Sequence, residues 1–276
     1  MQRKKPLVTI YTINKDYGKY IDQCINSVIN QTYKNIEYLI IDDGSTDNSI
    51  EKIKKYRKKR GVKIFFQKNI GLVKSINKAI KVSKGDYIIR LDSDDYLDKN
   101  AIKILLNNIF KFKAAIVFPD YYLVDENGNL INRIKRHNFN KNVTLFNQPA
   151  HGACTLYKKS VFEEVGLYSK KYDCQDGVYM WMKVINKYKI SNVNKPLFYY
   201  RQHSKSLTKN FQKIFDTKKS IYEEINKKNK KKNICFFPLR TLDEISFNKN
   251  KSLKFLILKI QKLKKLKKFS KIIISS

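Results

Sequence analysis

Apolar and polar residues alternate in two patterns along the first hundred positions of the chain. Runs that are almost wholly apolar or β-branched, such as Leu7–Thr12, Ile36–Ile41 and Tyr87–Leu91, are typical of strands covered on both faces. Between these runs, apolar residues recur at the spacing of an amphipathic helix, first at Ile21, Cys24, Ile25, Val28 and Ile29. The same patterns predict helices over residues 47–59 and 71–83 and a strand over 62–67. Strand and helix thus alternate four times, which predicts an α/β fold with a mostly parallel central sheet flanked by helices.

Beyond residue 99 the pattern changes, and we place a boundary there. Helices are predicted over residues 100–112, 159–165 and 176–188, and strands over 115–118, 151–157 and 196–201. A hairpin is predicted over 121–131 around Asn127-Gly128-Asn129, and the polar stretch 132–150 is a candidate loop over the site. From about residue 211 Lys and Asn dominate the composition, so the chain divides into 1–99, 100–210 and a Lys-rich tail, 211–276, which we expect to be helical.

The tail and the overall charge both suggest acidic partners. Residues 249–271 carry an apolar stripe at helical spacing surrounded by lysines, which fits a helix lying on an anionic membrane or, equally, one docked on the rest of the chain. The chain has 58 Lys and Arg against 24 Asp and Glu, a net charge of +34, which favours nucleic acid, an anionic membrane or a nucleotide as partner. An AT-rich coding sequence also produces abundant Lys, Asn and Ile without selection for binding.

Several classes of protein are disfavoured by what the sequence lacks. The four cysteines are scattered without a CxxC pair, which argues against a zinc ribbon and suits free thiols in a reducing cytoplasm. No GxGxxG and no GxxxxGK[ST] motif occurs, so neither a dinucleotide Rossmann site nor a P-loop is predicted. No apolar stretch reaches 18 residues, so we expect no transmembrane helix and a cytoplasmic protein.

The strongest candidate for chemistry is the stretch Arg90-Leu91-Asp92-Ser93-Asp94-Asp95, which follows the predicted strand over 87–91. Three carboxylates within four residues repel one another, so they need a cation to hold them together. Oxygen ligands suit Mg²⁺ or Mn²⁺, which could in turn bridge a diphosphate at the carboxyl end of a strand. The alternative is a solvated Asp-rich turn.

Three further groups of residues can be read in two ways. Asp42 and Asp43, at the end of the second predicted strand, could accept hydrogen bonds from a base or a ribose, or could form a helix-capping turn. Asp176, at the start of a predicted helix, could take a proton from an attacking hydroxyl or could be a simple cap. Arg201 could meet a phosphate, and His203 could bind phosphate or metal or lie on the surface.

Taken together, these residues resemble a known family. Its successive motifs are matched by VTIYTINKDYGKYIDQCINSVINQTYKNIEYLIIDDGSTDNS, NIGLVKSINKAI, GDYIIRLDSDDYL, HGACTLYKKSVFEEVGLY, QDGVYMWMKV and YRQHSKSLT. In order and spacing they are similar to family-two inverting glycosyltransferases of the bacterial surface-polysaccharide type, over about residues 7–207. The tail beyond about residue 210 is outside the resemblance.

The resemblance implies a GT-A fold with a nucleotide-sugar-binding half, residues 1–99, and an acceptor-binding and catalytic half, residues 100–210. It implies a nucleotide-diphosphate sugar as donor, a divalent metal such as Mn²⁺ or Mg²⁺, and transfer to an acceptor hydroxyl with inversion. The acceptor would be a saccharide, free or linked to a lipid, in surface polysaccharide or lipopolysaccharide synthesis. Together with the tail, this suggests a cytoplasmic enzyme peripheral to the membrane.

Site residues follow from the resemblance position by position. The donor nucleotide or sugar would be contacted by Tyr11, Thr12, Asn14, Asp42, Asp43, Asn77, Asp92, Asp95 and Arg201. Asp94, with Asp92 and His203, matches the metal-binding positions, and Asp176 matches the catalytic base.

Two positions depart from the family pattern. Ile76-Asn77 stands where the family usually has Arg-Asn, so a donor-contacting cation is missing unless Lys74 replaces it. Gln175 precedes Asp176 where Glu is usual.

Two other classes of function compete with this interpretation. A nucleic-acid-binding protein would use the charge of +34, but carboxylates at strand ends would repel a phosphate backbone, and its binding would fall steeply with salt and need no metal. A non-catalytic protein on the same frame would bind a nucleotide-sugar and leave it intact.

Overall fold

A computed structural model of the 276-residue chain describes residues 5–136, 152–172, 174, 176–184, 187–204 and 211–230. The chain forms two compact units, residues 1–136 with 150–218, and residues 137–149 with 219–276. Of the second unit, only residues 219–230 are described, and they form the end of helix α7, Phe211–Lys230. The sheet and the candidate site belong to the first unit.

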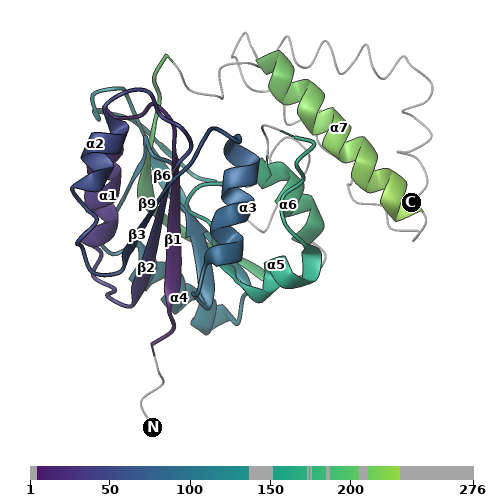
Figure 1. Ribbon diagram of the computed structural model, residues 1–276. Helices are drawn as coiled ribbons and strands as arrows, with labels where there is room; N and C mark the ends of the chain where they lie inside the picture. The colour runs from purple at the N-terminus through teal and green to yellow at the C-terminus, as the bar shows by residue number, and fades with distance from the viewer. Residues whose placement is uncertain are drawn as a thin grey trace. The chain divides into compact units, whose positions relative to one another are not determined.

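The first ninety described residues form an α/β unit with a parallel sheet, as the alternation of apolar runs predicts (Figure 1). Its parallel strands lie in the order β3-β2-β1-β4, with bounds β1 Val8–Asn14, β2 Ile36–Asp42, β3 Val62–Phe66 and β4 Tyr87–Arg90. The crossovers contain α1 Ile21–Ile29, α2 Ser49–Lys54 and α3 Leu72–Val82.

The rest of the first unit extends this sheet with strands of both directions. The described residues give nine strands in the order β3-β2-β1-β4-β8-β6-β9-β5, with β7 beside β6. The added strands are β5 Tyr96–Leu97, β6 Ile116–Val124, β7 Leu130–Ile134, β8 Leu156–Lys158 and β9 Ile190–Arg201. The added helices are α4 Ala101–Phe112, α5 Ser160–Val165 and α6 Asp176–Val184. The longest pairings, β1 with β2 and β6 with β9, are parallel.

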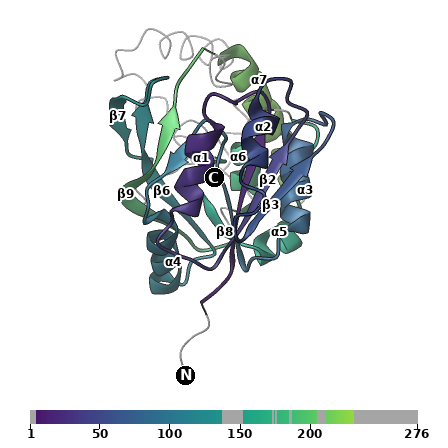
Figure 2. The same ribbon diagram turned by 60° about the vertical axis from the view of Figure 1, so that its left-hand side comes forward.

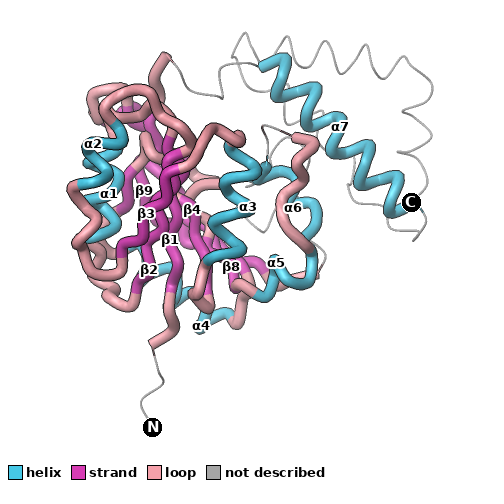
Figure 3. Tube along the Cα trace, viewed as in Figure 1, coloured by secondary structure: helices cyan, strands magenta, loops and turns pink. Residues whose placement is uncertain are grey.

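Helices cover both faces of the sheet, which is why the central strands are apolar throughout (Figures 1 and 2). Along β2, Tyr38 and Ile40 pack with α1 and α4 in one core, whereas Leu39 and Ile41 pack with α3 and α6 in the other. In the tube view the strands lie between these two helical layers (Figure 3). All four of these β2 side chains are at most 1% exposed, so the strand is fixed by burial on both sides.

Strands β6 and β9 differ from the sequence-based prediction. The predicted strand over 115–118 and the first arm of the predicted hairpin are one strand, β6, because Pro119 sits at a shift in register, where a missing N–H is tolerated. Strand β9 begins at Ile190 rather than at Pro196, because residues 190–193 already pair with residues 116–119 of β6. The pairing resumes at Pro196 beyond the same register shift.

Other predicted boundaries also move. The polar stretch over 132–150 begins inside β7, which ends at Ile134, while residues 137–150 and the predicted helix over 249–271 lie outside the described residues. Helix α6 ends at Val184 instead of residue 188, and α7 lies within the tail, 211–276, that was predicted to be helical. Among the described helices, none combines the length and the apolar character needed to cross a membrane.

Candidate active site

The parallel strands deliver their last residues to one edge of the sheet. Asn14 at the end of β1 pairs with Asp42 at the end of β2, and Leu91, just after β4, donates its N–H to the Tyr11 carbonyl at 3.0 Å. The chain runs from β1 through β2 to β3 on one side of β1, and α3 then returns it across the sheet to β4 on the other side of β1. In an open α/β sheet, ligands bind in the crevice at such a switch point. The carboxylates that follow β2 and β4, Asp43 and Asp92–Asp95, lie at this edge of the sheet.

Asp94 lies against a histidine from the far end of the domain. Its Oδ2 is 2.9 Å from Nε2 of His203, which follows β9. The imidazole stacks on Tyr20 with ring centres 5.4 Å apart and meets Tyr17 edge-on at 5.5 Å. Burial, followed by the nearby carboxylates of Asp94 and Asp92, raises the pKa of Tyr17. The aromatic rings therefore fix the imidazole beside the carboxylate.

Asp95 is buried, with 1% of its surface exposed. Its Oδ1 accepts the backbone N–H of Arg201 at 2.9 Å, but its Oδ2 has no hydrogen-bond partner in the described part of the chain. Burial, followed by Asp94 and Asp92, raises the pKa of Asp95 well above its ordinary value. An orphaned carboxylate oxygen in this position is a candidate for ligand or metal contact.

The side chain of Arg201 is used inside the protein. Its Nε donates to the Asp94 carbonyl at 2.9 Å, its Nη1 to the Glu126 carbonyl at 2.9 Å and its Nη2 to Gln23 Oε1 at 2.6 Å. The guanidinium also lies 4.8 Å from the centre of the Tyr20 ring. Arg201 therefore ties the carboxylate segment to α1 and to the turn between β6 and β7.

Arg90 joins the carboxylate segment to α6. Its Nε is 2.5 Å from Asp92 Oδ1 and its Nη1 is 2.6 Å from Asp176 Oδ2. Burial lowers the pKa of Arg90, but the charges of Asp92 and Asp176 outweigh it and raise that pKa well above its ordinary value. Burial raises the pKa of Asp92, with Arg90 opposing it. The base candidate is thus close to the metal-binding candidates although it is distant in sequence.

The two adjacent carboxylates at the end of β2 have different surroundings. Asp42 is fully buried and accepts hydrogen bonds from Asn14 Nδ2 at 2.9 Å and from the Ser45 N–H and hydroxyl at 2.9 and 2.7 Å. Asp43 accepts N–H groups from Ile70 at 3.0 Å and Gly71 at 2.9 Å in the loop before α3. Both carboxylates shape the loops around the proposed nucleotide site.

Four other positions proposed to contact the donor have mixed surroundings. Tyr11 is buried with Ile76 in the core, and the Thr12 hydroxyl bonds the Tyr38 hydroxyl at 3.0 Å. Asn77 exchanges hydrogen bonds with the backbone of Tyr168, at 2.9 and 3.0 Å. Lys74 is exposed on α3.

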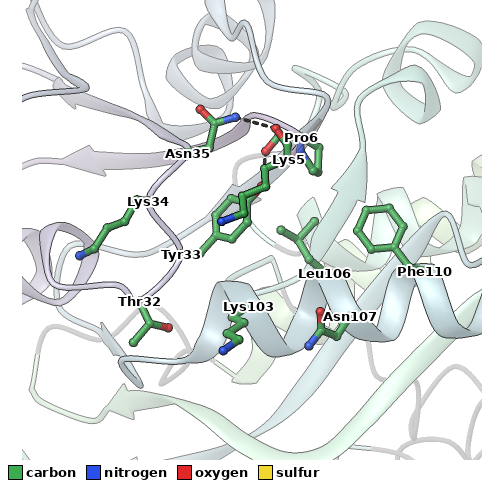
Figure 4. A pocket seen from close by; sticks show the side chains of 10 residues that line it. All are labelled: Lys5, Pro6, Thr32, Tyr33, Lys34, Asn35, Lys103, Leu106, Asn107 and Phe110. Atoms are coloured by element: carbon green, nitrogen blue, oxygen red, sulfur yellow. Dashed lines mark hydrogen bonds between the residues drawn. The ribbon is translucent and has the colours of Figure 1, made fainter. Parts of the chain in front are cut away.

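A separate groove of about 910 Å³ lies at the opposite edge of the sheet (Figure 4). It is lined by the segments that precede β1 and β2, including Lys5 and Tyr33, and by α4, including Lys103 and Phe110. No carboxylate is among its ten lining residues, and none of them belongs to the cluster around Asp94. The carboxylates, and not this groove, therefore mark the candidate active site.

Comparison with known proteins identifies the family. The sequence model of glycosyl transferase family 2 matches residues 8–166, which include both carboxylate groups at the strand ends, Asp42 with Asp43 and Asp92 with Asp94 and Asp95. The chain belongs to this family. Residue 176 lies beyond the matched range, so this match does not bear on Asp176 as the candidate catalytic base.

Named members of the family share part of the sequence. Over 220 residues the chain is 30% identical to glycosyltransferase GlyG of Streptococcus pneumoniae serotype 4, covering 73% of this chain and 72% of GlyG. Over 128 residues it is 40% identical to chondroitin synthase of Pasteurella multocida (strain Pm70), covering 46% of this chain. The match spans only 13% of that synthase, so the activity of the whole synthase cannot be transferred to this chain.

Solved structures show the fold of this family-two glycosyltransferase to be GT-A. Residues 1–349 of S. aureus TarS, in complex with UDP-GlcNAc, superpose with a TM-score of 0.63 at 21% identity, covering 74% of this chain and 61% of that one. The mannosyltransferase PcManGT from Pyrobaculum calidifontis, in complex with GDP-Man and Mn²⁺, superposes with a TM-score of 0.63 at 10% identity, covering 82% and 65%.

The described residues of this glycosyltransferase contain no group of three or more His, Cys, Asp or Glu side chains arranged to enclose a metal ion. Mg²⁺ is commonly held by one or two carboxylates together with substrate phosphates, and not by a cage made wholly of protein. Asp94, the orphaned Oδ2 of Asp95 and the imidazole of His203 supply oxygen and nitrogen donors of that kind. The residues present therefore fit a divalent cation shared with a diphosphate.

Sequence reasoning assigned no role to Arg90, Tyr17 or Tyr20. A partner for Arg90 could have been predicted from the sequence. An arginine at the end of a buried strand needs an anionic partner, and Asp92 follows two positions later. The aromatic contacts with His203 carried no such signal, because they join segments more than 180 positions apart.

Proposed function

We propose that this family-two glycosyltransferase moves a sugar from a nucleotide-diphosphate sugar to an acceptor hydroxyl, with inversion at the anomeric carbon. The observation that carries the proposal is the approach of Asp176 to the Asp92–Asp95 segment through Arg90, at 2.5 and 2.6 Å. A donor-binding segment and a proton acceptor must be neighbours for a single displacement, because both substrates react in one step.

In this mechanism Asp176, as a carboxylate, accepts the proton of the acceptor hydroxyl. The hydroxyl oxygen forms a bond to the anomeric carbon from the face opposite the leaving group. The bond from that carbon to the diphosphate oxygen breaks, and its electron pair leaves with the nucleoside diphosphate. Attack from the opposite face inverts the configuration.

Asp94, with Asp92, Asp95 and His203 around it, would hold the divalent cation. When bound, a cation there would neutralise charge that develops on the departing diphosphate. Asp43 and Asn14 border the proposed nucleotide pocket, with Tyr11, Thr12, Asp42 and Asn77 supporting its walls and Arg201 fixing the carboxylate segment. In the acceptor half, residues 100–210, the hydroxyl would approach from the side of α6.

For the pathway we propose synthesis of a bacterial surface polysaccharide. The relatives named chondroitin synthase and hyaluronan synthase, each 40% identical over 128 residues, support a saccharide as acceptor. The apolar stripe over residues 249–271, with the lysines around it, supports a cytoplasmic location on an anionic membrane, which would suit a lipid-linked acceptor or lipopolysaccharide.

The test is nucleotide release from a panel of UDP-, GDP- and dTDP-sugars, with Mn²⁺, with Mg²⁺ and with chelator. Wild type should release nucleotide from one donor of the panel, and only in the presence of metal. Asp94→Ala should abolish this release, and Asp176→Asn should abolish transfer to an added saccharide. The anomeric configuration of the product, read by NMR, decides inversion. No release and no metal-dependent nucleotide binding would reject the proposal in favour of a nucleic-acid-binding protein.

A further inference from the structure

Arg90 has the features of a residue placed for more than the stability of the sheet. It is the last residue of β4, and its side chain is 9% exposed. A buried guanidinium requires partners for its charge, and it has two: Asp92, two positions later, and Asp176, which opens α6. The two carboxylates have different proposed tasks, one in donor binding and one in proton transfer.

The contacts use separate atoms of the guanidinium. Nε meets Asp92 Oδ1 at 2.5 Å, and Nη1 meets Asp176 Oδ2 at 2.6 Å. Because the guanidinium is planar and rigid, the positions of these two nitrogens fix the separation and direction of the two carboxylates. Lysine carries its three donors on a single nitrogen and cannot reproduce this spacing.

The backbone closes over the pair from the β8 side. A Cβ atom at Gly152 would lie 2.8 Å from Arg90 Nη1 and 2.9 Å from Asp176 Oδ2, so only glycine fits without a shift. The same segment is anchored to Arg90, since the Cys154 N–H donates to the Arg90 carbonyl at 2.7 Å. With Asp176 only 13% exposed, the ion pair is largely shielded from water, which strengthens it.

The pairing leaves the second oxygen of Asp176 for the acceptor. Arg90 engages Oδ2, and no described residue forms a hydrogen bond to Oδ1. A carboxylate held by one oxygen presents the other in a fixed direction, which is what transfer from a bound hydroxyl requires.

We propose that Arg90 is a positioning residue that holds the carboxylate of Asp176 at a fixed place beside the donor-binding segment around Asp92. This inference rests on the proposed function. In this role Arg90 contacts the two carboxylates of Asp92 and Asp176 and need not contact the donor or the acceptor. It acts on transfer through Asp176, so its removal should lower kcat for transfer while the nucleoside diphosphate still binds.

The experiment is a double-mutant cycle with Arg90→Met, Asp176→Asn and the double variant, in the full chain. The exposed Arg57→Met is the matched control and should transfer like wild type. We expect Arg90→Met to lower kcat roughly 100-fold, as a displaced catalytic group does. The double variant should be no slower than Asp176→Asn, because in this proposal Arg90 acts on the transfer step through Asp176.

Two further measurements separate positioning from a merely structural role. Calorimetric titration with UDP, GDP and dTDP in Mn²⁺ should give dissociation constants within about threefold of wild type for Arg90→Met, whereas a collapsed site would lose binding. Guanidinium ion added to Arg90→Gly should restore part of the lost kcat and should not rescue Asp176→Asn. If Arg90→Met fails to fold, the cycle is run with Arg90→Lys, which keeps the charge but not the spacing.

Additive losses in the cycle, with wild type and Arg57→Met active, would overturn the role of Arg90 and leave the proposed function standing. A wild-type kcat in a folded Arg90→Met would do the same. No transfer by wild type with any donor would instead reject the proposed function, and this role with it.

Discussion

Replacement of Arg201 by methionine distinguishes a structural role from the phosphate contact that its sequence position suggests. Arg201 is 2% exposed, and its guanidinium donates to the carbonyls of Asp94 and Glu126 and to Gln23 Oε1. A fourth contact, from Nη1 to the Asp125 carbonyl, is longer at 3.3 Å. Methionine fills a similar volume but cannot donate to these oxygens, although the Asp125 carbonyl keeps another donor, the Gly128 N–H at 3.1 Å.

The cost follows from the number and kind of hydrogen bonds that methionine cannot make. A hydrogen bond to a charged group contributes about 1.5–3 kcal/mol, and the cation–π contact with Tyr20 adds roughly 1 kcal/mol. The contributions are not additive, because water can reach some of the exposed oxygens once the guanidinium is gone. We therefore expect Arg201→Met to lower the free energy of unfolding by about 3–4 kcal/mol, which for a unit of this size lowers Tm by roughly 10 °C.

The assay is urea unfolding followed by the fluorescence of Trp181, the single tryptophan of the chain. This side chain is 3% exposed and meets Phe118 edge-on at 6.0 Å, so its emission reports directly on the sheet. Arg57→Met, on an exposed surface, should change stability by less than about 0.5 kcal/mol. If Arg201→Met is as stable as this control but loses nucleoside diphosphate binding, the reasoning is refuted and Arg201 is a phosphate contact.

Three further outcomes can be checked. The pKa of Asp95 is raised in the folded state, so the stability that Asp95 contributes is present at acid pH and is lost as pH rises through that pKa. In the presence of chelator, Asp95→Asn should therefore flatten the fall in Tm toward neutral pH, and an unchanged slope would contradict this. Gly152→Ala should force Arg90 and Asp176 apart and lower kcat roughly 100-fold with the far-UV spectrum intact, while wild-type kcat would show that the backbone yields. Deletion of residues 249–276 should reduce pelleting with anionic vesicles but not with neutral ones, and equal pelleting with anionic vesicles would remove the membrane role.

Much of the first half of the fold can be predicted from local sequence. The strand over 36–41 and the helix from Ile21 to Ile29 appear where the apolar pattern predicts them, because burial on both faces or on one helical face is encoded in adjacent positions. The second half is less readable. Strand β6 runs through Pro119 and pairs with β9 some seventy positions later, so its length is decided by a partner that no local pattern reveals.

The family motifs and the residue types of the candidate site can be recognised in the sequence alone. Carboxylates at the ends of Ile36–Asp42 and Tyr87–Arg90 had to share one edge, since parallel strands end together. The role of each side chain at that edge depends instead on tertiary packing. Arg201, read as a phosphate contact, donates to backbone carbonyls, and Arg90, read without a role, joins Asp92 to Asp176. The partners of a buried charge are chosen by the packing of segments distant in sequence, and burial makes that choice energetically decisive.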